Sequence, residues 1–148
     1  STGNNSQANN LIQNNIKKMK SVLAHIGRSF LGLYFLIPGI GKFSSWDSSV
    51  ALMETHNMKM IPVLLAISGM AQVVGGLSLL LNKHVVICSL GFALMIILIN
   101  INLHDFWNVY EGVSADREAQ NFFKNLGIFA GLLLLAALNM KEPSKKDR

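Results

Sequence analysis

The sequence predicts an all-α fold, a transmembrane four-helix antiparallel bundle. The chain contains four apolar runs, and each is about as long as the roughly 20 helical residues that cross a hydrocarbon core. Hydrophobic residues make up 51% of the chain and charged residues only 14%, against about 25% charged in a typical soluble domain. The predicted spans cover residues 22–41, 61–81, 85–103 and 122–140, within a membrane domain over 21–141.

The first run is preceded by residues 1–20, which are rich in Asn, Gln and Ser and end in a lysine cluster. Such a segment buries too little apolar surface to fold alone, so we expect a mobile polar and basic N-terminal tail. The run itself continues to Gly41, which favours an uncleaved span over a signal peptide. Pro38 lacks an amide donor and is expected to interrupt this helix. Residues 142–148 form a basic C-terminal tail.

The second and third runs are joined only by residues 82–84, which predicts an antiparallel helix pair. Gln72 lies near the middle of the second run, and Gly75 and Gly76 follow it. Small residues let helices approach closely and an amide can hydrogen-bond across such a contact, so we expect a helix–helix interface here. The fourth run contains a similar small-residue spacing, Gly127-x-x-x-Gly131, which is weaker evidence for a helix contact.

The distribution of charge predicts the topology. Most of the 13 Lys and Arg residues flank the termini and the short 82–84 turn, whereas most acids lie in the longer segments 43–60 and 104–121. Positive residues mark the cytoplasmic side, so both termini are expected in the cytoplasm of a bacterial cell, with the protein in the inner membrane. The +5 net charge is therefore attributed to membrane orientation, and no nucleic-acid partner is expected.

Arg28 lies inside the first predicted span, where a charge costs about 2.5 to 3.5 kcal/mol on insertion scales. Its guanidinium could reach the cytoplasmic headgroups along the side-chain stem. Alternatively, it is buried and paired within the bundle. The sequence leaves both interpretations open.

The polar residues near the outer ends of the spans suggest one shared site. His104 and Asp105 end the third span beside Trp107, where a carboxylate can tune the histidine or simply turn the chain. The first span reaches the same depth at Lys42, and Lys42 or Lys124 is the expected counter-ion of Asp105. The candidate ligand cluster is Lys42, Trp46, His104, Asp105, Trp107, Lys124 and Asn125.

Metal and haem chemistry find little support in the spacing of possible ligands. The four histidines fall at span ends and no two share a helix, which disfavours haem. No Cys-x-x-Cys or His-x-x-x-His pair is present, so no metal site is predicted. Cys88, the only cysteine, is interpreted as an apolar filler within the third span.

Several stretches resemble the DoxX family of small bacterial membrane proteins. The resemblance covers about 110 residues, and it implies a four-helix inner-membrane protein associated with redox or sulfur metabolism, with quinone as electron acceptor. Two positions depart from the family pattern: Pro38 replaces a small residue and Gln72 replaces a common acidic one. The matching residues are Gly27-Arg28, Gly32 to Leu36, Gly39, Lys42-Phe43, Gln72, Gly75-Gly76, His104 to Trp107, Phe123 to Leu126 and Gly131 to Leu133.

Three functions are compatible with these observations. The first is an accessory or anchoring subunit of a membrane redox system, which would contact lipids and a partner enzyme or further copies of itself. The second is a quinone- or thiol-linked oxidoreductase component whose pocket lies at the outer interface, so whether the chain is an enzyme stays open. The third is a small transporter or channel, although one bundle offers no evident hydrophilic path.

Overall fold

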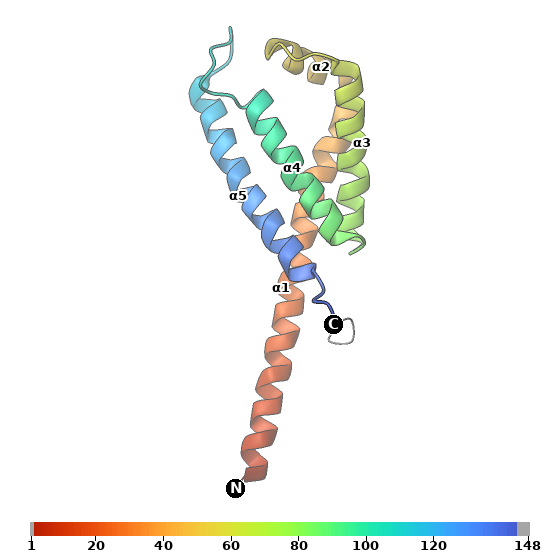
Figure 1. Cartoon of the computed structure of the whole chain (residues 1–148), viewed down its shortest axis with the longest axis vertical. Helices are drawn as coiled ribbons and strands as arrows, with labels where there is room; N and C mark the ends of the chain where they lie inside the picture. The colour runs from red at the N-terminus through yellow and green to blue at the C-terminus, as the bar shows by residue number, and fades with distance from the viewer. Residues whose placement is uncertain (1, 145–148) are drawn as a thin grey trace.

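The computed structural model describes residues 2–144, so Ser1 and most of the predicted C-terminal tail lie outside the described residues. The described chain is helical with connecting turns, and four of its helices are long and apolar enough to cross a membrane. The all-α prediction is confirmed. The helices are α1 Thr2–Ser44, α2 Trp46–Thr55, α3 Ile61–Leu80, α4 Val85–Leu103 and α5 Ala115–Asn139 (Figure 1).

Local signals set the ends of the helices. Pro62 stands in the first turn of α3, where its missing amide donor costs nothing. Asn82 and His84 adopt positive φ angles of 56° and 50°, which turn the chain sharply between α3 and α4. Ser114 caps α5 by accepting a hydrogen bond from the amide of Arg117. Because of these signals, α3 and α4 begin and end close to the limits of their apolar runs.

α1 differs from the expectation in two respects. It begins at Thr2, so the segment expected to be a tail is helical and projects from the bundle as the lower half of α1 (Figure 1). α1 also runs through Pro38 without a break, so the expected interruption was wrong. Extending a formed helix costs far less than nucleating one, and a proline removes only one amide donor.

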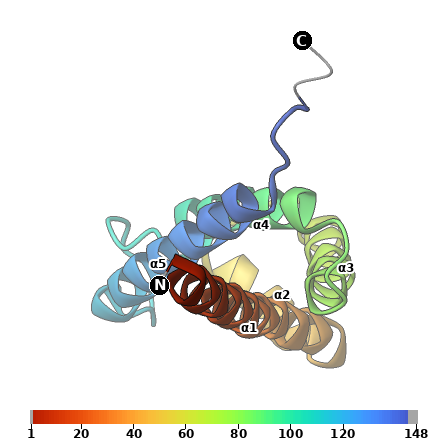
Figure 2. The ribbon, with the colours of Figure 1, turned by 90° about the horizontal axis from the view of Figure 1, so that it is seen from below.

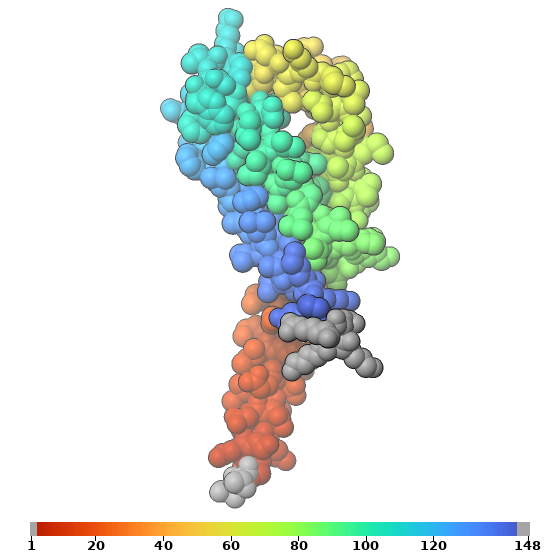
Figure 3. Space-filling model, in the orientation of Figure 1, coloured from red at the N-terminus to blue at the C-terminus, as the bar shows by residue number. Residues whose placement is uncertain are grey.

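The bundle consists of two close helix pairs, α1 with α3 and α4 with α5 (Figure 2). The pairs meet in a buried core, where the rings of Phe35 and Phe92 stack with centroids 3.9 Å apart. Toward α2 the pairs separate, and an opening is visible between α3 and α4 (Figure 3). The core residues are Phe35, Leu79, Val85, Phe92, Ala93, Ile96, Leu132 and Leu135.

The glycines of α3 make the predicted close contacts. Gly76 faces α1, whereas Gly75 faces α4, where a Cβ atom would lie 2.5 Å from the ring of Phe92. The side chain of Gln72 fills the space left by Gly39 of α1, since a Cβ atom there would lie 2.7 Å from that of Gln72. The prediction of a helix contact at this face is confirmed.

The corresponding expectation for α5 was wrong. A Cβ atom on Gly127 or Gly131 would meet no other atom of the described chain within 4 Å. The Gly-x-x-x-Gly spacing therefore makes no contact within this bundle. α5 packs through larger residues, among them Leu132 and Leu135.

Candidate functional site

The candidate site lies at the end of the bundle where α2 approaches the segment between α4 and α5 (Figure 1). His56 immediately follows α2 and Asp105 follows α4 by two residues. His56 Nε2 lies 3.9 Å from Asp105 Oδ1, and the side chains are only 1% and 5% exposed. This contact links the two helix pairs above the opening between them.

Asp105 is held by its own loop. It accepts a hydrogen bond from Asn108 Nδ2 at 2.9 Å and a short one from the Tyr110 hydroxyl. Desolvation would raise the pKa of the Asp105 carboxyl, but these two bonds, a backbone bond and the charge of His56 together lower it below its ordinary value. The bond to Asp105, burial and the carboxylate charge all raise the pKa of Tyr110. Asp105 is therefore a carboxylate at neutral pH.

The hydrogen bond that His56 makes to the backbone fixes a proton on Nδ1. Nδ1 lies 3.0 Å from the carbonyl oxygen of Leu52, which can only accept, so Nδ1 carries a proton. Nε2 and Asp105 Oδ1 are both buried and have no hydrogen-bond partner among the described residues. The ring also packs against Tyr110, with centroids 4.8 Å apart. The unsatisfied pair thus presents one ring nitrogen beside one carboxylate oxygen.

His104 makes a separate pair. Its Nδ1 lies 2.6 Å from Glu118 Oε2, in the first turn of α5. Of the two roles left open for Asp105 beside His104, tuning the histidine is therefore not the one observed, because consecutive residues at a helix end point in different directions and the carboxylate at His104 is that of Glu118. The pair is only partly buried, with side chains 21% and 13% exposed.

The expected counter-ions of Asp105 also differ from those found. Among the described residues, no ion pair joins Asp105 to Lys42 or Lys124. Lys42 is half-buried on α1 against Gly69 of α3, in the other helix pair, and Lys124 is exposed on α5. Matched depth in the membrane was not enough to identify the partner, because the helix pairs separate at this end.

The remaining predicted site residues lie around this end. Trp46 begins α2 and stacks on Phe43, with ring centroids 6.3 Å apart. Trp107 is about half exposed and contacts the ring of Phe122 edge-on, as an interfacial anchor would. Among the described residues, neither tryptophan ring contacts the ring of His56.

Asn125 belongs to a buried chain of hydrogen bonds across three helices. The hydroxyl of Tyr34 on α1 donates to Asn125 Oδ1 at 3.2 Å, and Asn125 Nδ2 donates to Asn100 Oδ1 at 2.9 Å. Asn100 Nδ2 then donates to the carbonyl of Phe122 at 3.0 Å. In hydrocarbon such bonds satisfy groups that would otherwise be costly, so this chain joins α1 to α4 and α5.

Arg28 and Gln72 occupy the inside of the bundle. Arg28 is 7% exposed and its Nε donates to the carbonyl of Leu79 at 2.8 Å. Leu79 lies in the last turn of α3, where its carbonyl also accepts from the Asn82 amide at 3.2 Å and where a cation is favourable. Arg28 is thus buried and caps α3, so of the two interpretations of the sequence, burial within the bundle holds and contact with the headgroups does not. Gln72 Oε1 is buried and has no hydrogen-bond partner among the described residues.

The sequence did not single out His56, Tyr110 or Glu118 for this site. His56 is separated from Asp105 by most of two spans, and no spacing rule connects them. The signal that could have identified His56 is its position at the end of a short helix, in an outer segment that also contains acidic residues. Within residues 2–144, no three His, Cys, Asp or Glu side chains converge as metal ligands would.

A bundle of four apolar spanning helices, with a buried polar cluster at one end, defines this chain as a multi-pass membrane protein. The DoxX family model matches residues 23–105, more than half of the chain. The chain belongs to the DoxX family, which confirms the resemblance over residues 23–105, and the stretches 123–126 and 131–133 lie outside the match. The match includes His56 and Asp105 but excludes α5. Comparisons with curated proteins and with solved structures give no match.

Proposed function

We propose that this chain is an accessory subunit of a membrane redox system and that it holds a quinone-type head group at the end closed by α2. Membership of the DoxX family supports the redox setting. The observation that carries the proposal is the buried, unsatisfied pair of His56 Nε2 and Asp105 Oδ1. The electron donor and acceptor belong to the partner enzyme and the quinone pool.

The chemistry of the pair suits both forms of such a ligand. With Nδ1 already donating to Leu52, Nε2 can donate to a quinone carbonyl when the ring is the doubly protonated imidazolium, whose charge the Asp105 carboxylate balances. Asp105 Oδ1 can accept from the hydroxyl of a quinol. Tyr110 and Asn108 occupy the other carboxylate oxygen, Oδ2, and so leave Oδ1 free for this role. The site binds and exchanges protons, while the electrons come from the partner.

The surroundings also suit an amphipathic ligand. The opening between α3 and α4 lies below α2 (Figure 3), and α4 exposes apolar residues such as Leu94 and Leu98. A ligand with a polar ring and an apolar tail needs a polar end group beside a lipid-accessible path. We infer from the charge distribution that this end is the outer one and that both termini are cytoplasmic.

Binding of a short-chain benzoquinone to the purified full chain in mild detergent tests the proposal. We expect saturable binding that His56→Phe weakens by about tenfold or more, because a hydrogen-bond donor is lost from a buried site. The matched control is His104→Phe, since His104 pairs with Glu118 and not with the His56–Asp105 pair. Equal loss in both variants, or no saturable binding to the wild type, would refute the assignment.

A second measurement tests the accessory role. Native membranes are solubilised gently, and proteins that co-purify with the full chain are identified and assayed for quinone-dependent oxidoreductase activity. We expect such an activity to co-purify with the wild type. If the chain purifies repeatedly without a redox partner yet still binds quinone, the accessory part is wrong and the ligand site stands.

A further inference from the structure

The outer surface of α1 carries an apolar stripe that continues from the projecting segment into the membrane span. Its members alternate in steps of four and three residues, which is the 3.5-residue average of a coiled-coil seam. All of them are exposed in the described chain. The stripe consists of Ile12, Ile16, Met19, Leu23, Ile26, Phe30, Leu33, Ile37 and Ile40.

In the projecting segment this periodicity is informative, because apolar residues are scarce there. Residues 2–20 are otherwise mainly Asn, Gln, Ser and Lys, with Leu11 the only large apolar residue off the stripe. A strict two-in-seven pattern is typical of a seam between helices rather than of a helix lying on its own core. Asn9 falls on the same seam one heptad before Ile16, and a single buried Asn there specifies register.

Nothing within the described chain covers this surface. Residues 3–27 are all exposed, and the first buried residue of α1 is Arg28. A lone helix of this length is marginal in water, and Asn and Gly are poor helix formers. Since α1 is nevertheless helical from Thr2, a partner along the seam accounts for both the helix and its pattern.

We propose that the partner is a second copy of this chain and that two α1 helices form a parallel coiled coil over residues 9–26. Copies inserted in one membrane share one topology, so their α1 helices are parallel and start at the same depth. A seam on α1 therefore meets itself around a two-fold axis along the membrane normal.

The charges agree with this arrangement. Lys17 and Lys18 fall on the helix faces that point away from the seam in the heptad register. Lys20 flanks the seam and would face Asn15 of the second copy rather than another cation. No pair of like charges is forced together in the projecting segment.

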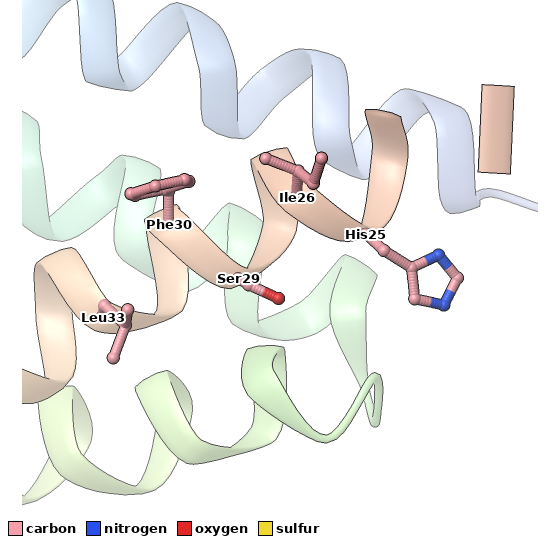
Figure 4. A pocket seen from close by; sticks show the side chains of 5 residues that line it. All are labelled: His25, Ile26, Ser29, Phe30 and Leu33. Atoms are coloured by element: carbon pink, nitrogen blue, oxygen red, sulfur yellow. The ribbon is translucent and has the colours of Figure 1, made fainter. Parts of the chain in front are cut away.

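The seam continues where α1 enters the bundle. A shallow groove of about 260 Å³ lies on α1 and is lined by His25, Ile26, Ser29, Phe30 and Leu33. Figure 4 shows these side chains on successive turns of α1. Ile26, Phe30 and Leu33 are members of the stripe, so the groove provides room for the side chains of the facing helix.

Cysteine cross-linking in native membranes tests the proposal. Cys88 is the only cysteine, so Cys88→Ala gives a clean background. Ile16→Cys and Met19→Cys place a thiol on the seam, and Asn14→Cys places one on the opposite face. On mild oxidation we expect covalent dimer from the seam variants at roughly five times the control yield or more, because only seam positions bring Cα atoms within disulfide reach.

Light scattering of the full chain in detergent gives an independent readout. We expect a dimer that Ile16→Glu with Met19→Glu converts to a monomer, whereas Asn10→Glu with Asn14→Glu leaves it intact. These positions are exposed, so the bundle itself should fold in all variants. Equal cross-linking on both faces, cross-links only to another protein, or an unchanged mass in the seam variant would overturn the proposal.

Discussion

Gly32 of α1 and Gly76 of α3 lie so close together that neither has room for a side chain. A Cβ atom on Gly32 would lie 2.9 Å from the carbonyl oxygen of Gly76, and one on Gly76 would lie 2.8 Å from that of Gly32. The obstruction in each case is backbone rather than a flexible side chain, so the helices would have to move apart. This contact holds the α1–α3 pair together.

Gly76→Ala should therefore destabilise the protein. Overpacking of a close contact typically costs about 1 to 3 kcal/mol, and Gly76→Leu should cost more. Thermal unfolding of the purified chain in detergent measures the effect. Gly131→Ala is the matched control, because a Cβ atom there meets no described atom within 4 Å. Similar melting temperatures for both variants would contradict the assigned packing.

Arg28→Met should lower stability because it removes the buried donor to the Leu79 carbonyl. The Leu79 carbonyl would keep its hydrogen bond from the Asn82 amide, so the expected cost is that of one lost hydrogen bond from a charged donor, about 1.5 to 3 kcal/mol. Arg28→Lys keeps the charge near the end of α3 and should lose less than Arg28→Met does. Lys18→Met, at an exposed position of α1 that points away from the seam, serves as the control in the same thermal assay. If Arg28→Met melts like this control, the guanidinium is not a cap.

The lowered pKa of Asp105 predicts a pH-dependent stability. A carboxyl whose pKa is lower in the folded state stabilises it above the unfolded pKa, which is about 3.9. That contribution is lost as the pH falls from about 4 through the lower folded pKa. Asp105→Asn should thus be less stable than wild type near pH 7, and the difference should shrink in acid.

Melting temperatures measured from pH 7 down to about pH 3 compare the two proteins across this window. Glu54→Gln is the control, because Glu54 is exposed at the end of α2. A difference in melting temperature between wild type and Asp105→Asn that stays constant across the range would mean that the charge of Asp105 does not contribute to stability.

Both termini should lie in the cytoplasm. Val109 is 97% exposed in the segment between α4 and α5, which makes it a suitable position for a reporter insertion. Alkaline phosphatase should be active when inserted there and inactive when fused after residue 148. A C-terminal fusion with high phosphatase activity would reverse the proposed orientation.

The apolar runs predicted α3 and α4 to within a residue because strong local signals bound both helices. The ends of α1 and α5 were harder to predict. Both helices continue into polar sequence, where hydropathy falls but helix formation goes on, as between Thr2 and Lys20. Hydropathy locates the part of a helix that is in lipid, and it carries little information about where the helix ends.

The site was predicted only in part. Asp105 and Asn125 were named as functional candidates because both lie at the outer ends of their spans, at one membrane level. Their partners were not predictable from sequence: charge suggested Lys42 or Lys124, whereas the structure pairs Asp105 with His56. Which helices lie side by side decides such pairings, and that depends on packing details such as Gly32 against Gly76.

The two helix pairs are also consecutive in the chain. The main neighbour of α1 is α3 and that of α4 is α5, with only residues 81–84 between the two halves. During synthesis the first half can therefore complete its Gly32–Gly76 contact before α4 has left the ribosome. Assembly of the second half then needs no rearrangement of the first, and the insertion machinery handles two hairpin-sized units in succession.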